Sequence, residues 1–288
     1  MNQKKQKGRS QAAQVLRRFR RSRSAMLGTV ILAIIILLAI FADVLYDYDT
    51  VVIKQNMAEQ FQHPSWAHPC GTDNYGRDVL ARIIHGARYS LGISFAAVFM
   101  ALLIGTVLGS IAGFYRKWAD MLIMRGADVL MAIPSLLMAI IIVSVAGSSA
   151  PIIAISIAIS SIPKFTRVAC SAVLSVSDME YIESARALGE SGPRIIAQHI
   201  LPNCFAPLLI QTTLSVATSI LAVSGLSYIG LGIETPIPEW GSMLSNARPY
   251  INSYGYLSVF PGIAIMLTIL ALNLMGDGFR DATDPKLK

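Results

Sequence analysis

The chain has 288 residues, of which 54% are hydrophobic and only 14% are charged, and its formal net charge is +7. A soluble domain carries about 25% charged residues, so this composition excludes an ordinary soluble protein and predicts an all-α integral membrane protein. Nine of the 24 Lys and Arg residues precede Ser24, beside an apolar run. Such clustering is typical of membrane orientation, so we expect membrane lipid and no nucleic acid as a partner.

Residues 1–24 are predicted to form a basic cytoplasmic tail, and residues 25–88 to hold the first membrane span and an extracytoplasmic segment. The run Met26–Ala42 lacks charge over 17 residues, longer than the apolar region of a cleaved signal peptide. We therefore expect it to be retained as a span. The loop His63–Cys70 contains two His residues and one Cys, but its two prolines favour a structural turn, and no metal site is predicted.

The end of the extracytoplasmic segment predicts an amphipathic helix that lies at the outer interface and then turns into the second span. Val79, Ile83 and Ile84 would form its apolar face, with Arg82 and His85 elsewhere.

Residues 89–288 are predicted to form a core with five further spans, each near or above the ~20 residues that cross a bilayer. With the N-terminus inside, the predicted cytoplasmic segments hold 19 Lys and Arg residues and the exterior holds five. This asymmetry predicts that both termini are cytoplasmic. The predicted spans are Tyr89–Phe114, Met121–Ala146, Pro151–Ala169, Phe205–Leu231 and Tyr256–Gly276, the third and fourth spans of the chain forming a tight hairpin.

Ionisable residues inside membrane spans mark ion or substrate pathways. The third span carries Arg125 and Asp128, three residues apart, which predicts a pair on one helix face that is either structural or part of a gate. The other five spans are expected to carry no charge at their centres. Pro134 should kink the third span. Gly105 and Gly109 form a G-x-x-x-G pattern that permits close helix packing, within the chain or between chains.

The sequence lacks the motifs of several enzyme classes. It has no G-x-x-x-x-G-K-[ST] phosphate loop, which indicates that the chain does not hydrolyse ATP itself. H-E-x-x-H and G-x-S-x-G are also missing, which disfavours a zinc protease and a serine hydrolase. We expect no enzyme activity, no catalytic residue and no cofactor in this chain.

The stretch 177–203 is a charged island that predicts two short cytoplasmic helices with a tight break. Ser177 and Glu180 form a capping-box pattern at the start of the first helix. Gly189 falls where a helix end favours positive φ, and Pro193 fits the first turn of a second helix. The apolar face predicted for the first helix consists of Met179, Ile182, Ala185 and Leu188. So small an amphipathic element is suited to docking on a partner.

The same stretch resembles the cytoplasmic "EAA" loop of ATP-binding-cassette (ABC) importer permeases in its peptide-transporter form, with Ser184 in place of an alanine. The segment 68–93 resembles the C-type subunit of dipeptide, oligopeptide and nickel importers, with Cys70 in place of a leucine. Segments 226–251 and 273–288 resemble the rest of that subunit, so the likeness covers residues 20–288. The residues that carry the likeness in the loop are Glu183, Ala185, Gly189, Ile195, His199, Leu201 and Pro202.

The resemblance implies the six-helix type I importer permease fold in the bacterial cytoplasmic membrane. Its partners would be a second permease, two ATPase subunits that bind ATP and Mg, and an extracytoplasmic solute-binding protein that delivers di- or oligopeptides. The loop 177–203 would be the coupling element in a groove of one ATPase, with Glu183 making polar contacts, Ala185 and Gly189 permitting close approach, and His199 and Pro202 fixing the second helix.

Four alternatives remain open at this stage. The first is a permease of the same family whose cargo is nickel or another small solute. An ion-coupled secondary transporter predicts charges or broken helices at the membrane midplane. A membrane-embedded enzyme needs a nucleophile or metal cluster at membrane depth. A scaffold without a transport role would not support ATP-dependent uptake.

Overall fold

The computed structural model describes residue 15 and residues 17–283. The predicted tail 1–24 therefore lies largely outside the described residues. Apart from one isolated β-bridge between Thr72 and Asp78, the regular elements among the described residues are helical, which confirms the all-α prediction. Five helices are long and apolar enough to cross a membrane: α2 (Arg23–Ile40), α4 (Val79–Tyr115), α7 (Ala150–Ser177), α10 (Phe205–Tyr228) and α12 (Tyr256–Thr283).

A bent helix pair supplies the sixth predicted span. Helices α5 (Lys117–Met131) and α6 (Ser135–Ala146) together pass the same length and hydropathy test but meet at an angle of 81°. Pro134 lies at the break, where its missing N–H and fixed φ prevent the helix from continuing. The predicted kink is confirmed, and it is sharp enough to split the span into two helices.

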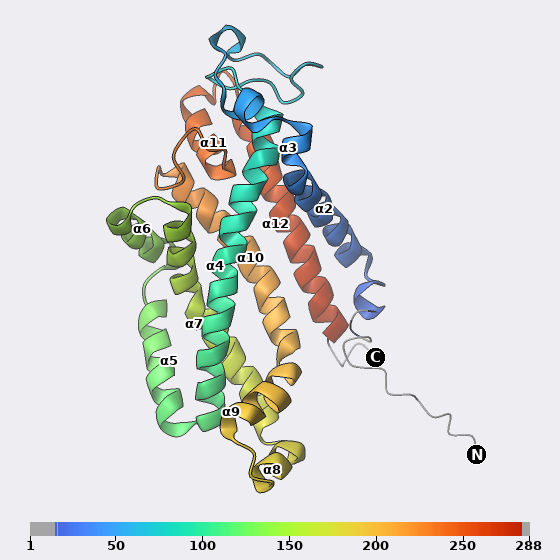
Figure 1. The fold of residues 1–288 in the computed structure, drawn as a ribbon, viewed down its shortest axis with the longest axis vertical. Helices are drawn as coiled ribbons and strands as arrows, with labels where there is room; N and C mark the ends of the chain where they lie inside the picture. Colours follow the sequence, from blue (N-terminus) through green and yellow to red (C-terminus); the bar gives the residue numbers. More distant parts are fainter. Residues whose placement is uncertain (1–14, 16, 284–288) are drawn as a thin grey trace, which may run out of the picture.

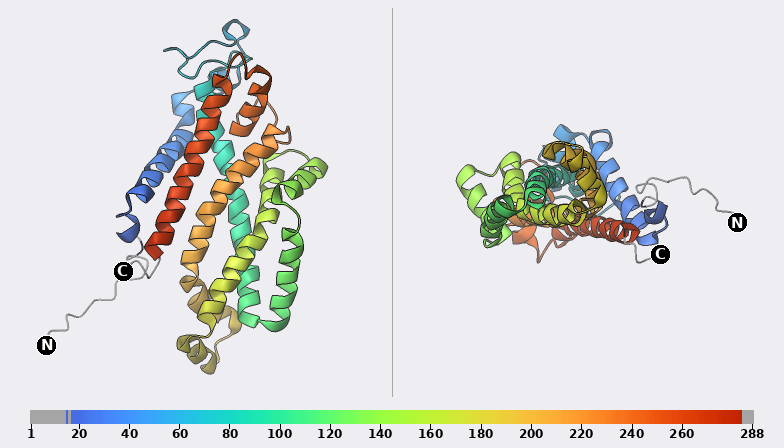
Figure 2. Two further views of the ribbon diagram at one scale, coloured as in Figure 1. Left: turned by 180° about the vertical axis from the view of Figure 1, so that it is seen from behind. Right: turned by 90° about the horizontal axis from the view of Figure 1, so that it is seen from below.

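The bundle is organised around α4, which packs along α7 on one side and contacts α10 on another. Figure 2 shows α2 and α12 side by side on one flank, with α5 and α6 on the opposite flank. Two features cap the ends of the bundle (Figure 1): α11 (Trp240–Ala247) and the segment after α2 at one end, and two short helices, α8 and α9, at the other. The remaining turns are α3 (Ala42–Leu45), Tyr48–Ile53, Met57–Glu59 and Arg248–Tyr250.

Helix α4 is continuous over 37 residues, about 55 Å at 1.5 Å per residue. The predicted amphipathic helix and second span are thus one helix, capped by the Asp78 carboxylate, which accepts a hydrogen bond from the Ala81 N–H at 2.8 Å. The predicted interfacial turn is wrong. Arg82 and His85 are also buried, at 2% and 1% exposure, because residues 46–78 fold over the start of the helix. Arg82 Nη1 donates to the Val52 carbonyl at 2.7 Å, and His85 Nε2 lies 2.9 Å from the Tyr46 carbonyl.

Three glycines allow α4 to lie directly against α7. A Cβ at Gly105 would lie 2.5 Å from Phe165 Cβ, and one at Gly113 would lie 2.9 Å from Val173 Cβ. A Cβ at Gly109 would collide with the Thr166 carbonyl. The G-x-x-x-G pattern therefore serves packing within the chain.

Helix α7 extends eight residues beyond the predicted end of the fourth span, to Ser177. Lys164 thus lies at the middle of a 28-residue helix, while the expectation that this span has no charge at its membrane centre stays a prediction. The predicted α6–α7 hairpin is confirmed: Gly147 turns the chain with φ of +98°, and α6 packs on α7.

The packing of α4 on α7 predicts that Gly109→Val lowers the free energy of unfolding by about 1–3 kcal/mol, because two helix backbones must separate. Thermal unfolding in detergent measures the change. Gly92→Val is the matched control, since Gly92 lies in the same helix and a Cβ there meets nothing within 4 Å. Equal losses in the two variants would show that helix propensity, and not packing, sets the cost.

Candidate functional site

The first helix of the predicted coupling element is α8 (Glu180–Ala187), which follows directly on α7. The capping-box prediction is wrong: α7 still includes Ser177, whose hydroxyl donates to the Val173 carbonyl at 2.7 Å, and Met179 occupies the cap position without a side-chain hydrogen bond. The reason is that the long helix continues past the sequence signal. Helix α8 is held instead by burial of Ile182 and Ala185 in the main core.

Gly189 ends α8 as predicted. Its φ is +81°, a region that residues with a Cβ rarely adopt. The Gly189 N–H donates to the Arg186 carbonyl at 3.0 Å, and the Glu190 N–H donates to the Ala185 carbonyl at 3.1 Å. This pair of bonds is the Schellman motif, which satisfies the last carbonyls of the helix. Nothing lies within 4 Å of a Cβ at this position, so the glycine is required by backbone conformation and not by space.

The second helix starts at α9 (Gly192–Ile195) and continues through a π-helical turn, Ile196–Ile200, and a 3₁₀ turn, Leu201–Asn203. Ile195 and Ile200 are buried at 1% and 0% exposure. Pro202 lies exposed in the 3₁₀ turn, where the second helix ends before α10 begins. The second helix therefore ends at Asn203, one residue after Pro202.

Two polar contacts join the two short helices. His199 Nε2 lies 3.1 Å from Glu190 Oε2, and Asn203 Nδ2 donates to the Tyr181 hydroxyl at 3.3 Å. Asn203 also donates to the His199 carbonyl at 2.7 Å. Sequence reasoning identified His199 but missed the Tyr181–Asn203 contact, which no local spacing signals because 22 residues separate the two. Residues 177–203 therefore form one braced unit, which we call the coupling element.

The coupling element rests on the end of α4. The Arg186 guanidinium lies 4.8 Å from the centre of the Phe114 ring, and a Cβ at Gly192 would lie 2.7 Å from the Tyr115 hydroxyl. Beside this contact, Arg116 Nη2 lies 2.6 Å from Asp178 Oδ1. The close approach at Gly192 leaves little room for the element to move independently of α4.

The outward face of the element differs from the predicted one. Glu183 is exposed, but Ala185 is 5% exposed and packs into the core of its own chain. Leu188, predicted on one apolar face with Ile182 and Ala185, is 82% exposed, because it occupies the C-cap position of the helix, just before the turn at Gly189. Met179 and Tyr181 are also exposed, at 47% and 42%. The exposed surface of the element therefore combines these three large side chains with the carboxylate of Glu183.

The predicted Arg125–Asp128 pair is replaced by a contact between two helices. Asp128 Oδ1 lies 2.5 Å from Arg167 Nη2 of α7, and both side chains are about half exposed. Tertiary packing brings Arg167, 39 residues away, closer to Asp128 than its helix neighbour. The ion pair therefore ties α5 to α7.

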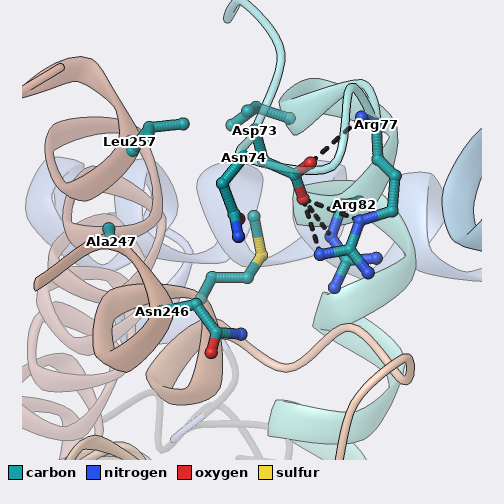
Figure 3. A pocket seen from close by; sticks show the side chains of 9 residues that line it. Asp73, Asn74, Arg77, Arg82, Asn246, Ala247 and Leu257 are labelled. Atoms are coloured by element: carbon teal, nitrogen blue, oxygen red, sulfur yellow. Dashed lines mark hydrogen bonds and ion pairs between the residues drawn. The ribbon is translucent and has the colours of Figure 1, made fainter. Parts of the chain in front are cut away.

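The opposite end of the molecule holds a second charged cluster, built on the start of α4. Asp73 accepts from Arg77 Nε at 2.8 Å, and Arg82 Nε lies 3.6 Å from the same carboxylate oxygen. Figure 3 shows Asp73 directed between the two guanidinium groups, beside a hollow of about 20 Å³ that Asn246 of α11 also lines. We interpret the cluster as the anchor that holds residues 46–78 on the bundle.

The His63–Cys70 loop is tied to the start of α4 through His68. His68 Nδ1 lies 2.8 Å from Asp78 Oδ2 and His68 Nε2 lies 3.9 Å from Glu59 Oε2. In the described part of the chain, no group of three or more His, Cys, Asp or Glu residues could hold a metal ion.

Comparisons with known proteins extend over nearly the whole chain. The family described as binding-protein-dependent transport system inner membrane component matches residues 105–288, and the N-terminal TM domain of oligopeptide transport permease C matches residues 10–64. A dipeptide transport system permease of Alkalihalophilus pseudofirmus is 44% identical over 275 residues, which cover 96% of this chain and 90% of that one.

Two further relatives and one solved structure are similar. A di/tripeptide transport system permease of Pseudomonas aeruginosa is 41% identical, with 94% of this chain and 90% of that one covered. A glutathione transport system permease of Escherichia coli is 42% identical, with 94% and 89% covered. The inward-facing MetNI methionine ABC transporter matches with a TM-score of 0.58 at 17% identity, over 70% of this chain and 97% of that one, which shows the fold.

Cys204, at the junction of the coupling element and α10, provides a test of how firmly the element is held. Burial raises the pKa of the Cys204 thiol to about 11. Because the thiolate is the reactive form, we expect slow alkylation at pH 8 that rises roughly tenfold per pH unit up to pH 10. Iodoacetamide labelling measures the rate. A cysteine introduced by Ser184→Cys on the exposed face should level off near pH 9, and equal rates at pH 8 would contradict firm packing.

The Asp128–Arg167 contact predicts a coupling free energy in a double-mutant cycle. We expect about 0.2–1 kcal/mol between Asp128→Asn and Arg167→Gln, the range of exposed pairs, measured by thermal unfolding in detergent. Asp128→Asn and Arg125→Gln should be additive. A coupling free energy between Asp128→Asn and Arg125→Gln, with none between Asp128→Asn and Arg167→Gln, would contradict the contact between the two helices and support the pair predicted from sequence spacing.

Proposed function

The chain belongs to the family of binding-protein-dependent transport system inner membrane components, and on that basis we propose that it carries short peptides across the cytoplasmic membrane as one permease subunit of an ABC importer. The relatives described above are named for dipeptides, di/tripeptides and glutathione, which are all short peptides. These names favour peptide over nickel as the cargo. Both termini lie in the cytoplasm in this proposal.

The observation that carries the proposal is the braced coupling element at one end of the bundle. Its interior is fixed by Ile182, Ile195 and Ile200, while Glu183 and Leu188 remain exposed. A rigid element with an exposed apolar and acidic face is suited to a groove on another protein. In the proposed complex that protein is one of two ATPase subunits, which bind ATP and Mg.

The proposed mechanism is mechanical and involves no covalent chemistry in this chain. ATP binding closes the ATPase pair and moves the coupling element as a rigid body. Contact of Arg186 with Phe114 and of Gly192 with Tyr115 passes the movement to the end of α4. Because α4 packs tightly on α7, the two helices move together, and the path between this chain and a second permease changes the side on which it is open.

The direct test is uptake by the complete transporter in proteoliposomes. We expect accumulation of a labelled dipeptide that requires ATP, both permeases, both ATPase subunits and the binding protein. Uptake of ⁶³Ni²⁺ under the same conditions, with no dipeptide uptake, would show that the cargo is nickel and not a peptide. Uptake driven by an ion gradient without ATP would refute the proposed energy source.

Gly189→Val is predicted to uncouple ATP hydrolysis from uptake. Valine at a φ of +81° costs about 1–3 kcal/mol, so the turn relaxes and the exposed face of α8 is displaced. We expect the number of peptides carried per ATP to fall at least tenfold while the complex still assembles. The measurement is the ratio of uptake to phosphate release in the same vesicles.

The matched control is Gly230→Val. Gly230 has a φ of +90°, and a Cβ there also meets nothing within 4 Å, but the residue follows α10 at the other end of the bundle. Its replacement imposes similar strain away from the ATPase subunits and should leave the ratio unchanged. An unchanged ratio in Gly189→Val would contradict the role of the turn.

A further inference from the structure

Four charged residues lie on the exposed side of the seam between α5 and α7. Arg125 and Asp128 belong to α5, and Lys164 and Arg167 belong to α7; all four are exposed in this chain. These three cations and one anion sum to +2, and the half-buried Asp120 of α5, which lies 3.8 Å from Cys170 of α7, adds a second anion to the seam. Among the described residues, Asp128 pairs with Arg167, while Arg125 and Lys164 have no ion-pair partner.

The length of α7 places Lys164 inside the hydrocarbon region. The helix has 28 residues, about 42 Å, and the hydrocarbon core of a bilayer is about 30 Å thick. Any 30 Å section of a 42 Å helix includes the midpoint of the helix. That midpoint falls between Pro163 and Lys164. If α7 crosses the bilayer, Lys164 lies at membrane depth.

A lysine exposed to lipid at this depth is costly, because hydrocarbon solvates an ammonium group poorly. Elsewhere the chain avoids that cost. Helix α12 also has 28 residues, and the exposed residue at its midpoint is Leu270, which is 45% exposed. The exposed large residues of α2 include Ile34 and Leu37 at about half exposure. The flank of α2 and α12 thus suits lipid, whereas the α5–α7 seam requires water or polar partners.

The four charges form a column along the seam. Asp120 Oδ1 lies 3.8 Å from Cys170 Sγ and Asp128 Oδ1 lies 2.5 Å from Arg167, so residue numbers rise along α5 as they fall along α7. The helices are therefore antiparallel. Lys164 and Arg167 are three residues apart and share a face of α7. Lys164 is the member of the column farthest from the α4–α5 turn.

Next to the column is an apolar hollow of about 320 Å³ between α4, α5 and α7. Leu122, Gly126, Ile162 and Pro163 are among the residues that line it. A short peptide combines apolar side chains with a terminal carboxylate. Lys164 does not line the hollow itself but directly follows Pro163, which does, so an apolar hollow and an unpaired ammonium group lie along one stretch of α7.

We propose that the α5–α7 seam lines the water-filled path and that Lys164 binds the terminal carboxylate of the passing peptide. This inference rests on the proposed function for its cargo, but its first part depends only on the depth and exposure of the charges. The Asp128–Arg167 pair neutralises one cation, so the attraction is concentrated at Lys164. An anionic lipid headgroup is the competing ligand, and it is disfavoured because headgroups lie outside the hydrocarbon core in which Lys164 sits.

The first experiment measures access of water to the seam in the complete transporter, reconstituted without nucleotide. Lys164→Cys and its matched control Leu270→Cys are labelled with a membrane-impermeant, charged thiosulfonate, and the rate of the parent with its buried native cysteines is subtracted. We expect Lys164→Cys to react at least tenfold faster than Leu270→Cys. Equal rates would overturn the assignment of the seam to the path.

The second experiment tests the carboxylate contact by protection. Ser161→Cys places a reporter three residues from Lys164 on the same helix face. A dipeptide with a free carboxylate should slow its labelling at least threefold when Lys164 is present, and not in the Lys164→Met background. The dipeptide amide should give no protection in either background, and Lys164→Arg should retain it. Equal protection by acid and amide would overturn the contact.

Two further outcomes separate the hypotheses. If labelling is slower in phosphatidylglycerol than in phosphatidylcholine vesicles and peptide has no effect, the ligand is lipid and the inference fails. Absence of ATP-driven peptide uptake by the unmodified transporter, with the Lys164/Leu270 contrast intact, would refute the proposed function alone. The labelling experiments need neither ATP nor the binding protein, so the two results are independent.

Discussion

Close contact between α4 and α7 is the constraint on which the rest of the molecule depends. In a bilayer, lipid tails are as apolar as side chains, so helices associate through tight packing more than through the hydrophobic effect. Gly105, Gly109 and Gly113 supply that packing, because each removes a Cβ that would press on the facing helix. Helix α10 and helix α5 each contact both members of this pair, α2 contacts α4, and α6 contacts α7.

The length of α4 lets this one helix connect the two ends of the protein. At its start, the buried Arg82 holds residues 46–78 through Asp73 and the Val52 carbonyl. At its end, Phe114 and Tyr115 contact the coupling element. A continuous helix transmits displacement along its axis with little loss, so a movement at one cap reaches the other. This geometry suits a permease that must couple events on opposite sides of a membrane.

The surface of the bundle divides into two regions with different physical requirements. The flank of α2 and α12 exposes apolar residues, as lipid demands, whereas the α5–α7 seam exposes Lys164 and the Asp128–Arg167 pair. The break within the third predicted span lies on the same side of the bundle as this seam, at Pro134 between α5 and α6. Irregular backbone at membrane depth is tolerated where protein or water covers it.

The sequence by itself determined the features that follow from local rules. Long apolar runs specified the spans, Pro134 specified the break, and Gly189 specified a positive φ, because each depends on the residue and its immediate neighbours. Only the tertiary structure decided which charges pair and which faces are buried. Asp128 pairs with Arg167 and not with Arg125. Arg82 and His85 are buried, whereas Leu188 is exposed. The surroundings of these side chains are formed by segments far apart in the sequence, which spacing along the chain does not predict.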